Sequence, residues 1–138
     1  MKQAYHQAQN ALMNGEVPVG AVIVSSKTVI AKSYNQCQLL NDATAHAEML
    51  AITAASNYLG AKYLKKCTLY VTLEPCIMCA GALFWSQIER VVFAVPDPER
   101  GFSKLSKNIL HPKTFIKEGI LVEECKLLID GFFRDLRN

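Results

Sequence analysis

The chain has 138 residues, a net charge of +3 and 51% hydrophobic residues, which suits one folded domain spanning residues 1–138. The absence of any run of 18 apolar residues argues against a membrane span, and the polar first residues do not resemble a signal peptide. We therefore expect a cytoplasmic protein. Five cysteines, an odd number, argue against a disulfide framework.

Hydrophobic periodicity and turn residues predict alternating helices and strands. In chain order, the pattern predicts a helix at 2–14, a hairpin of strands at 17–24 and 28–34, a helix at 45–59, a strand at 68–72, a helix at 75–86, a strand at 90–95, a polar loop with a short helical turn at 96–113, a strand at 114–122 that is broken near Gly119, and a helix at 123–137. This order predicts an α/β fold, a three-layer α/β/α sandwich with helices on both faces of the sheet.

Capping residues and apolar stripes refine three of these helices. Asp42 or Thr44 is expected to cap the helix at 45–59, and Pro75 to stand in the first turn of the next helix. The final helix is predicted to be amphipathic, with one apolar face formed by Cys125, Leu128, Phe132 and Leu136.

Two cysteines at the start of the third predicted helix have the spacing of metal ligands. In the segment Leu73-Glu74-Pro75-Cys76-Ile77-Met78-Cys79-Ala80, both sulfurs can point at one place, and a helix N-terminus favours thiolate. Such a pair is half of a zinc site. A redox dithiol or two buried packing thiols would fit the same spacing. The other three cysteines lack it and are interpreted as ordinary buried or half-buried thiols: Cys37, Cys67 and Cys125.

The segment Thr44-Ala45-His46-Ala47-Glu48 adds a third ligand and an acid–base group. His46 offers a nitrogen at another helix start, and three protein ligands leave the fourth tetrahedral position open to water, as in catalytic zinc sites. Glu48, two residues further on, can reach that water. A solvated helix glutamate is the alternative, but Glu48 stands among apolar residues. His6 and His111 have no partner at ligand spacing and are predicted to lie at the surface.

An HxE motif followed by PCxxC is typical of the zinc nucleobase deaminases. The chain resembles the bacterial tRNA-specific adenosine deaminases, members of the cytidine deaminase-like superfamily, over nearly its whole length. The resemblance is carried by four segments, which are Gly15–Val22, Asp42–Glu48, Thr68–Ala82 and Phe132–Arg134.

The resemblance implies a cytidine deaminase-like fold with a five-stranded mixed sheet and one Zn2+ per subunit. His46, Cys76 and Cys79 would hold the zinc, and Glu48 would carry protons. The implied reaction is hydrolytic deamination of adenosine to inosine at the wobble position of a tRNA anticodon. The implied assembly is a homodimer in which each active site is bordered by the neighbouring subunit.

The resemblance also implies the contacts with substrate. Asn35 and the backbone of Ala47 would hold the flipped base, while Phe133 and Arg137 would meet the anticodon stem-loop. The chain departs from the family pattern at the rim of the expected site, and none of these departures is a zinc ligand: Gln36, Ala43, Phe84-Trp85 and Ala94-Val95-Pro96-Asp97. They therefore bear on the substrate more than on the chemistry.

Several side chains keep two interpretations at this point. Phe84 and Trp85 fit a core or dimer contact better than nucleotide stacking. The basic cluster of Lys104, Lys107 and Lys113 fits either phosphate binding or a solvated loop. Phe132 belongs to the apolar stripe of the last helix, whereas Phe133 is offset from it and free to meet RNA.

Two other functions compete with tRNA editing. A deaminase of a free nucleobase or nucleoside, of the guanine or cytosine type, would share every catalytic residue and differ at the rim of the pocket. The basic excess after Arg100 and the Phe-Phe-Arg sequence near the end favour tRNA. A zinc module that binds RNA without catalysis would have no use for Glu48.

Overall fold

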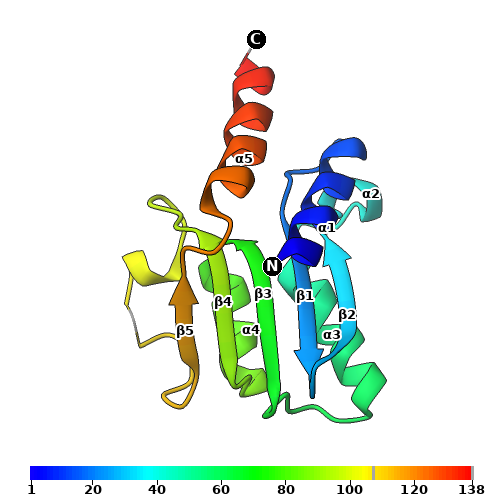
Figure 1. Cartoon of the computed structure of the whole chain (residues 1–138), viewed down its shortest axis with the longest axis vertical. Helices are drawn as coiled ribbons and strands as arrows, with labels where there is room; N and C mark the ends of the chain where they lie inside the picture. Colours follow the sequence, from blue (N-terminus) through cyan, green and yellow to red (C-terminus); the bar gives the residue numbers. More distant parts are fainter. Residues whose placement is uncertain (107, 138) are drawn as a thin grey trace.

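The computed structural model describes residues 1–106 and 108–137. At its centre is a sheet of five strands in the order β2-β1-β3-β4-β5 (Figure 1). The strands are β1 Gly20–Ser25, β2 Thr28–Tyr34, β3 Cys67–Leu73, β4 Arg90–Val95 and β5 Phe115–Glu118. β1 runs antiparallel to both β2 and β3, whereas β3, β4 and β5 are parallel. The predicted five-stranded mixed sheet is confirmed.

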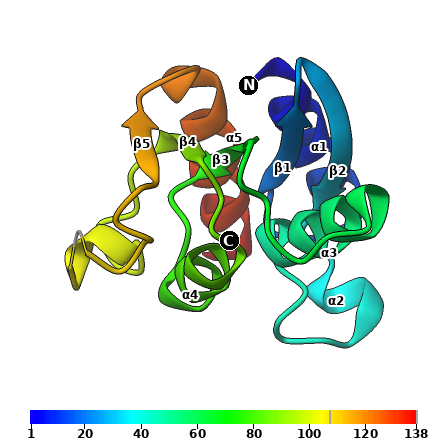
Figure 2. The same ribbon diagram turned by 90° about the horizontal axis from the view of Figure 1, so that it is seen from below.

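Helices cover both faces of this sheet (Figure 2). On one face lie α1 Lys2–Met13 and α5 Val122–Arg137, and on the other lie α3 Ala47–Leu59 and α4 Ile77–Ser86. The short helix α2 Cys37–Leu40 and the 3-10 turn η1 Phe102–Lys104 belong to connections. The three-layer α/β/α sandwich is therefore confirmed. Within the described residues, no helix is long and apolar enough to cross a bilayer.

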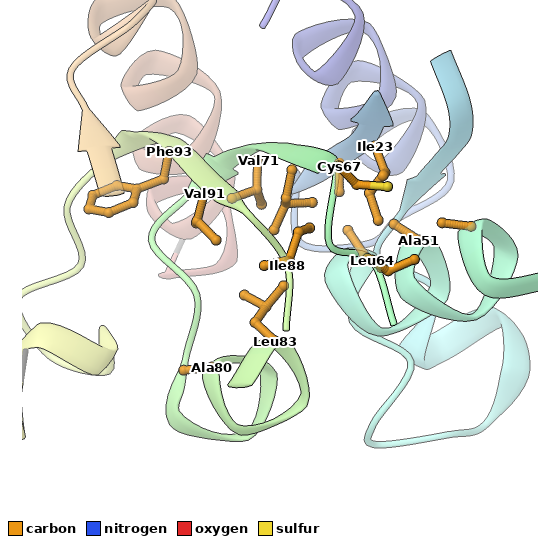
Figure 3. Close-up of a cluster of buried hydrophobic side chains, with 14 of the residues drawn as sticks. Ile23, Ala51, Leu64, Cys67, Val71, Ala80, Leu83, Ile88, Val91 and Phe93 are labelled. Carbon is orange, nitrogen blue, oxygen red and sulfur yellow. The ribbon is translucent and has the colours of Figure 1, made fainter. Parts of the chain in front are cut away.

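The main hydrophobic core lies between the sheet and the pair α3 and α4 (Figure 3). Strand β4 is buried from Val91 to Val95 because helices cover it on both faces, which explains its continuous apolar run. Helix α3 presents alanines to the sheet, and their small side chains let the helix backbone approach closely: Ala47, Ala51 and Ala55. This close packing fixes where α3 begins, and its first turn carries the predicted acid–base residue.

The starts of α3 and α4 differ from the sequence prediction. Thr44 donates hydrogen bonds through its N–H and hydroxyl to Asp42 Oδ1, at 2.8 and 2.7 Å, so both residues are used in a turn that precedes the helix. His46 occupies the N-cap of α3, and Cys76 the N-cap of α4, which places Pro75 just before its helix. Neither side chain makes a capping hydrogen bond to its helix.

The C-terminal third also departs from the prediction. The strand predicted at 114–122 ends at Glu118, beside the break expected near Gly119, and it does not resume because Gly119 and Leu121 adopt positive φ angles and turn the chain into α5. The predicted apolar face of α5 is wrong at Leu136, which is 67% exposed, while Ile129 is buried in its place. The reason is visible in Figure 1, where the second half of α5 extends beyond the edge of the sheet.

Candidate functional site

Three potential metal ligands meet where α3 and α4 begin. His46 Nδ1 lies 3.6 Å from Cys76 Sγ and 3.5 Å from Cys79 Sγ. The three donor atoms all lie within 4.8 Å of one another. Because His46 and Cys76 are N-caps and Cys79 lies in the first turn of α4, the positive ends of two helix dipoles face this cluster. The structure therefore brings together the three residues that the sequence singled out as ligands.

These donors fit zinc. Tetrahedral zinc with a Zn–N distance of about 2.0 Å and a Zn–S distance of about 2.3 Å separates nitrogen from sulfur by about 3.5 Å. The two observed separations between His46 and the cysteines match this value. One imidazole and two thiolates leave the fourth tetrahedral position for water, so the donor set is that of a catalytic rather than a structural zinc site.

The electrostatics of the cluster favour thiolate. Hydrogen bonds from the Cys79 thiol and the His46 ring lower the pKa of Cys76 to about 4, although burial opposes this shift. The hydrogen bond to Cys76 in turn raises the pKa of the Cys79 thiol and that of the His46 imidazole. The low pKa of Cys76 favours its thiolate form, which is the form that binds a metal ion.

Glu48 lies beside this cluster in the first turn of α3. Only 4% of its surface is exposed, and burial raises the pKa of its carboxyl to about 7. Acid–base catalysis is most effective when the pKa of the group lies near the working pH, since the group must both accept and return a proton. The solvated-glutamate interpretation of Glu48 is therefore wrong, and its environment suits a proton carrier.

The cluster opens into a cavity of about 650 Å³. Its walls include His46, Glu48 and Cys76, together with Asn35 from the end of β2 and Phe133 from α5. A second, smaller cavity shares Asn35, His46 and Phe133 with the first. The volume is sufficient for a small organic ligand such as a nucleobase, and the polar groups converge at one place.

The predicted substrate contacts are only partly brought together. Asn35 is 9% exposed and lines the cavity, and Phe133, on α5, is 42% exposed and also lines it. Ala47 is fully buried, and its carbonyl accepts a 2.6 Å hydrogen bond from the Ser33 hydroxyl. Arg137 lies exposed in the last turn of α5 and does not line this cavity.

Other predicted residues lie outside the cluster. Cys67 and Cys125 are buried and Cys37 is half-buried, and burial raises the pKa of each thiol, as expected of packing cysteines. His6 is exposed, whereas the His111 ring packs 5.8 Å from that of Phe84 and is half-buried.

Trp85 of α4 and the described lysines of the basic loop face solvent, whereas Phe84 is half-buried. Trp85 is 76% exposed, although its ring contacts that of Phe84 edge to face at 5.5 Å. This exposure excludes Trp85 from the core of the subunit. Lys104 and Lys113 are exposed, and Lys107 lies outside the described residues.

Sequence reasoning missed two buried carboxylates. Glu16 is 1% exposed and accepts hydrogen bonds from the N–H groups of Gln38 and Leu39, which holds α2 beside Asn35. Glu74 is 4% exposed and precedes the Cys76 turn. The apolar residues flanking Glu74 were the available signal, since a buried carboxylate needs hydrogen-bonding partners.

Comparisons with known proteins agree with this geometry. Residues 1–95 match the family described as the cytidine and deoxycytidylate deaminase zinc-binding region. The tRNA-specific adenosine deaminase of Aquifex aeolicus is 47% identical, over all of this chain and 94% of that protein. A solved structure from work on A-to-I editing by tRNA:A34 deaminases superposes with a TM-score of 0.87 at 38% identity, covering 93% of this chain and 96% of that one.

A guanine deaminase is also similar. The enzyme of Bacillus subtilis superposes with a TM-score of 0.68 at 33% identity, covering 97% of this chain and 90% of that chain. Both solved structures share the fold that surrounds the His46, Cys76 and Cys79 cluster. The chain therefore belongs to the zinc-binding cytidine and deoxycytidylate deaminase family, and within it to the group of the tRNA-specific adenosine deaminases.

Proposed function

We propose that residues 1–138 form one zinc-dependent deaminase domain that converts adenosine to inosine at the wobble position of a tRNA anticodon. The observation that carries this proposal is the juxtaposition of the Glu48 carboxyl with a three-donor metal cluster on the wall of an open cavity. The substrate is inferred from the 47% identity to a tRNA-specific adenosine deaminase along the whole chain.

His46, Cys76 and Cys79 would hold the zinc ion. Zinc in such a site acts as a Lewis acid that lowers the pKa of a coordinated water toward neutrality. Glu48 would accept a proton from a water molecule held at this site and deliver it to N1 of adenine, while the water oxygen adds to C6. Glu48 would next take the remaining proton from the oxygen added to C6 and pass it to the amino group, so that the C6–N bond breaks, ammonia leaves and the C6 carbonyl forms. The products are inosine and ammonia, so Glu48 ends the cycle as it began.

The base must leave the anticodon stack to reach Glu48. An anticodon loop is already partly single-stranded, so moving one base out of the stack costs only about a few kcal/mol. Asn35, held at the end of β2, is placed to hydrogen bond the base, and the first turn of α3 around Ala47 would support it. Phe133 stands between the two cavities, where a ring can stack on a neighbouring base.

We further propose a cytoplasmic homodimer. Large apolar side chains on α4 remain exposed, with Ile77 at 54% and Trp85 at 76%. A dimer that covers them would remove this apolar surface from water. A cytoplasmic location agrees with a tRNA substrate. Arg137, in the last turn of α5, is proposed to contact the anticodon stem-loop through phosphate.

Deamination of free guanine is the second candidate, because the likeness to the Bacillus subtilis guanine deaminase spans nearly the whole chain. The test offers the enzyme an anticodon stem-loop with adenosine at the wobble position, and separately free guanine, cytosine and adenosine. Inosine is read as an A-to-G change on sequencing, and ammonia is measured in parallel. We expect inosine in the stem-loop and little ammonia from the free compounds. Ammonia from guanine with an unchanged stem-loop would overturn the proposal.

Replacing Phe133 with alanine is expected to raise KM for the stem-loop by about 10-fold, since stacking of a base on an aromatic ring contributes about 1–3 kcal/mol. Leu127→Ala is the matched control, because Leu127 is 72% exposed on the same helix and does not line the cavity. Steady-state kinetics on the stem-loop measure both variants. An unchanged KM for Phe133→Ala would exclude a contact between this ring and RNA.

A further inference from the structure

The carboxylate of Glu74 ties together two ends of one surface segment. Glu74 is 4% exposed and stands at the end of β3, two residues before Cys76. Its Oε1 accepts a 3.0 Å hydrogen bond from the N–H of Asp97. Its Oε2 accepts hydrogen bonds from the N–H and the hydroxyl of Ser103, at 2.9 and 2.6 Å. One buried carboxylate therefore holds the first and last residues of the segment 97–103.

The rest of this segment wraps around the turn that carries Cys76. Gly101 pairs with Cys76 in an isolated antiparallel bridge, and the N–H of Phe102 donates to the Pro75 carbonyl at 3.0 Å. A side chain at position 101 would collide with the Glu74 carboxyl, so the glycine is needed for this close approach. Segment and turn are thus packed with no space between them.

The outer side of the same segment forms a wall of the substrate cavity. Pro96, Asp97, Pro98, Glu99 and Arg100 all line the cavity into which the metal cluster opens. Asp97 Oδ1 accepts hydrogen bonds from the N–H groups of Glu99 and Arg100, at 3.0 and 3.1 Å, which shapes the turn. The position of this wall therefore depends on where Asp97 is held, and Glu74 holds it.

The hydrogen bonds that join Glu74 to Asp97 and Ser103, here called the clamp, require a carboxylate. All three partners are donors, and a carboxylate accepts at both oxygens. A glutamine amide would turn its NH₂ group toward the N–H of Asp97 or of Ser103, so that two donors would face each other at a partly buried contact. Aspartate is shorter by one methylene and could not span from the end of β3 to both partners.

We propose that Glu74 is a positioning residue that fixes the segment 97–103 as the substrate-facing wall of the cavity and holds it against the Cys76 turn. The inference rests on the proposed function, because the wall matters only if the cavity receives the base. Glu74 itself transfers no proton in the mechanism above. It acts through Asp97 and Ser103.

The test compares Glu74→Gln with the wild-type protein in its zinc-loaded form. We expect amide hydrogen exchange at Asp97 and Ser103 to accelerate at least 10-fold, while exchange in α1 stays unchanged. We expect KM for the stem-loop to rise at least 10-fold and kcat to change less than 3-fold, with zinc still at one ion per chain. If Glu74 only stabilised the fold, Glu74→Gln would instead accelerate amide exchange throughout the chain and lower both kcat and the free energy of unfolding.

Two further variants keep the test decisive. Glu118→Gln, on the exposed edge strand β5, is the control and should change neither exchange nor KM. Ser103→Ala removes only the 2.6 Å hydroxyl bond and is expected to give a smaller effect in the same direction, about 3-fold in KM. Adding Ser103→Ala to Glu74→Gln should raise KM no further, because both substitutions break the same contact. If Glu74→Gln does not fold, Ser103→Ala decides by the same measurements.

Unchanged exchange at Asp97 and Ser103 would overturn the clamp. Faster exchange with an unchanged KM would overturn its role in the substrate wall. Amide exchange is measured without substrate. A wild-type enzyme that does not deaminate the stem-loop would therefore contradict the proposed function without testing the clamp. The exchange rates at Asp97 and Ser103 alone would then decide whether the clamp exists.

Discussion

Glu48→Gln is expected to lower kcat about 1,000-fold or more while the protein keeps one zinc ion per chain. Glutamine has nearly the shape of glutamate but cannot accept and return a proton, and general acid–base catalysis contributes about 100- to 10,000-fold. The environment of Glu48 supports the upper part of this range, because burial raises the pKa of its carboxyl to about 7. Single-turnover inosine formation measures the rate, and elemental analysis measures the zinc.

The control for this prediction is a glutamate far from the site. Glu118→Gln carries the same change on the exposed strand β5 and should leave kcat within about 2-fold of the wild type, since surface substitutions are usually nearly neutral. A Glu48→Gln enzyme that retains more than a tenth of the wild-type kcat would exclude Glu48 as the proton carrier. Loss of zinc in that variant would assign Glu48 to metal binding instead.

Cys79→Ala is expected to weaken zinc binding by more than about 100-fold and to abolish turnover. Removing a residue that only hydrogen-bonds a metal ligand typically lowers metal affinity by about 10- to 100-fold. Cys79 supplies one of the three direct donors, so its loss should cost more. Zinc content after dialysis against a weak chelator, and competition with a chromophoric chelator, give the affinity. The melting temperature should also lose its dependence on added zinc, because a ligand stabilises only the state that binds it.

A second buried cysteine provides the matched control. Cys67 is 1% exposed at the start of β3 and lies outside the ligand cluster. Cys67→Ala should lose some stability through the cavity it leaves, but keep full zinc occupancy. If Cys79→Ala also keeps full occupancy, the assignment of the ligands is wrong.

The metal cluster and the layer order could be predicted because their signals are local. His46 and Glu48 are two residues apart, and Cys76 and Cys79 three, so each half of the site is contained in one helix start. The order of strands and helices likewise follows from short periodic runs. The burial of Glu48 was also predictable, since its apolar neighbours along α3 lie against the sheet.

The features that were missed depend on partners distant in sequence. Glu74 bonds Asp97 and Ser103, 23 and 29 residues later, and nothing in their local sequence indicates the pairing. Helix starts were misplaced for a related reason. Capping propensity favours Asp42 or Thr44, but the turn that they form places His46 at the N-cap, where its ring faces the cysteines.

The last helix shows a different limit of the sequence pattern. Periodicity identifies an apolar stripe but not where the supporting sheet ends. Cys125 and Ile129 pack against β4, whereas Leu136 lies beyond the sheet and is exposed. Phe133 lies in the part of α5 that no longer packs against the sheet, which explains why it lines the cavity rather than the core.

X-ray absorption at the zinc K-edge of the purified protein tests the geometry on which the whole account depends. We expect two sulfur neighbours at about 2.3 Å and two nitrogen or oxygen neighbours at about 2.0 Å, from Cys76, Cys79, His46 and one water. Four sulfur neighbours, or a protein purified without zinc that does not take it up, would contradict the proposed catalytic centre.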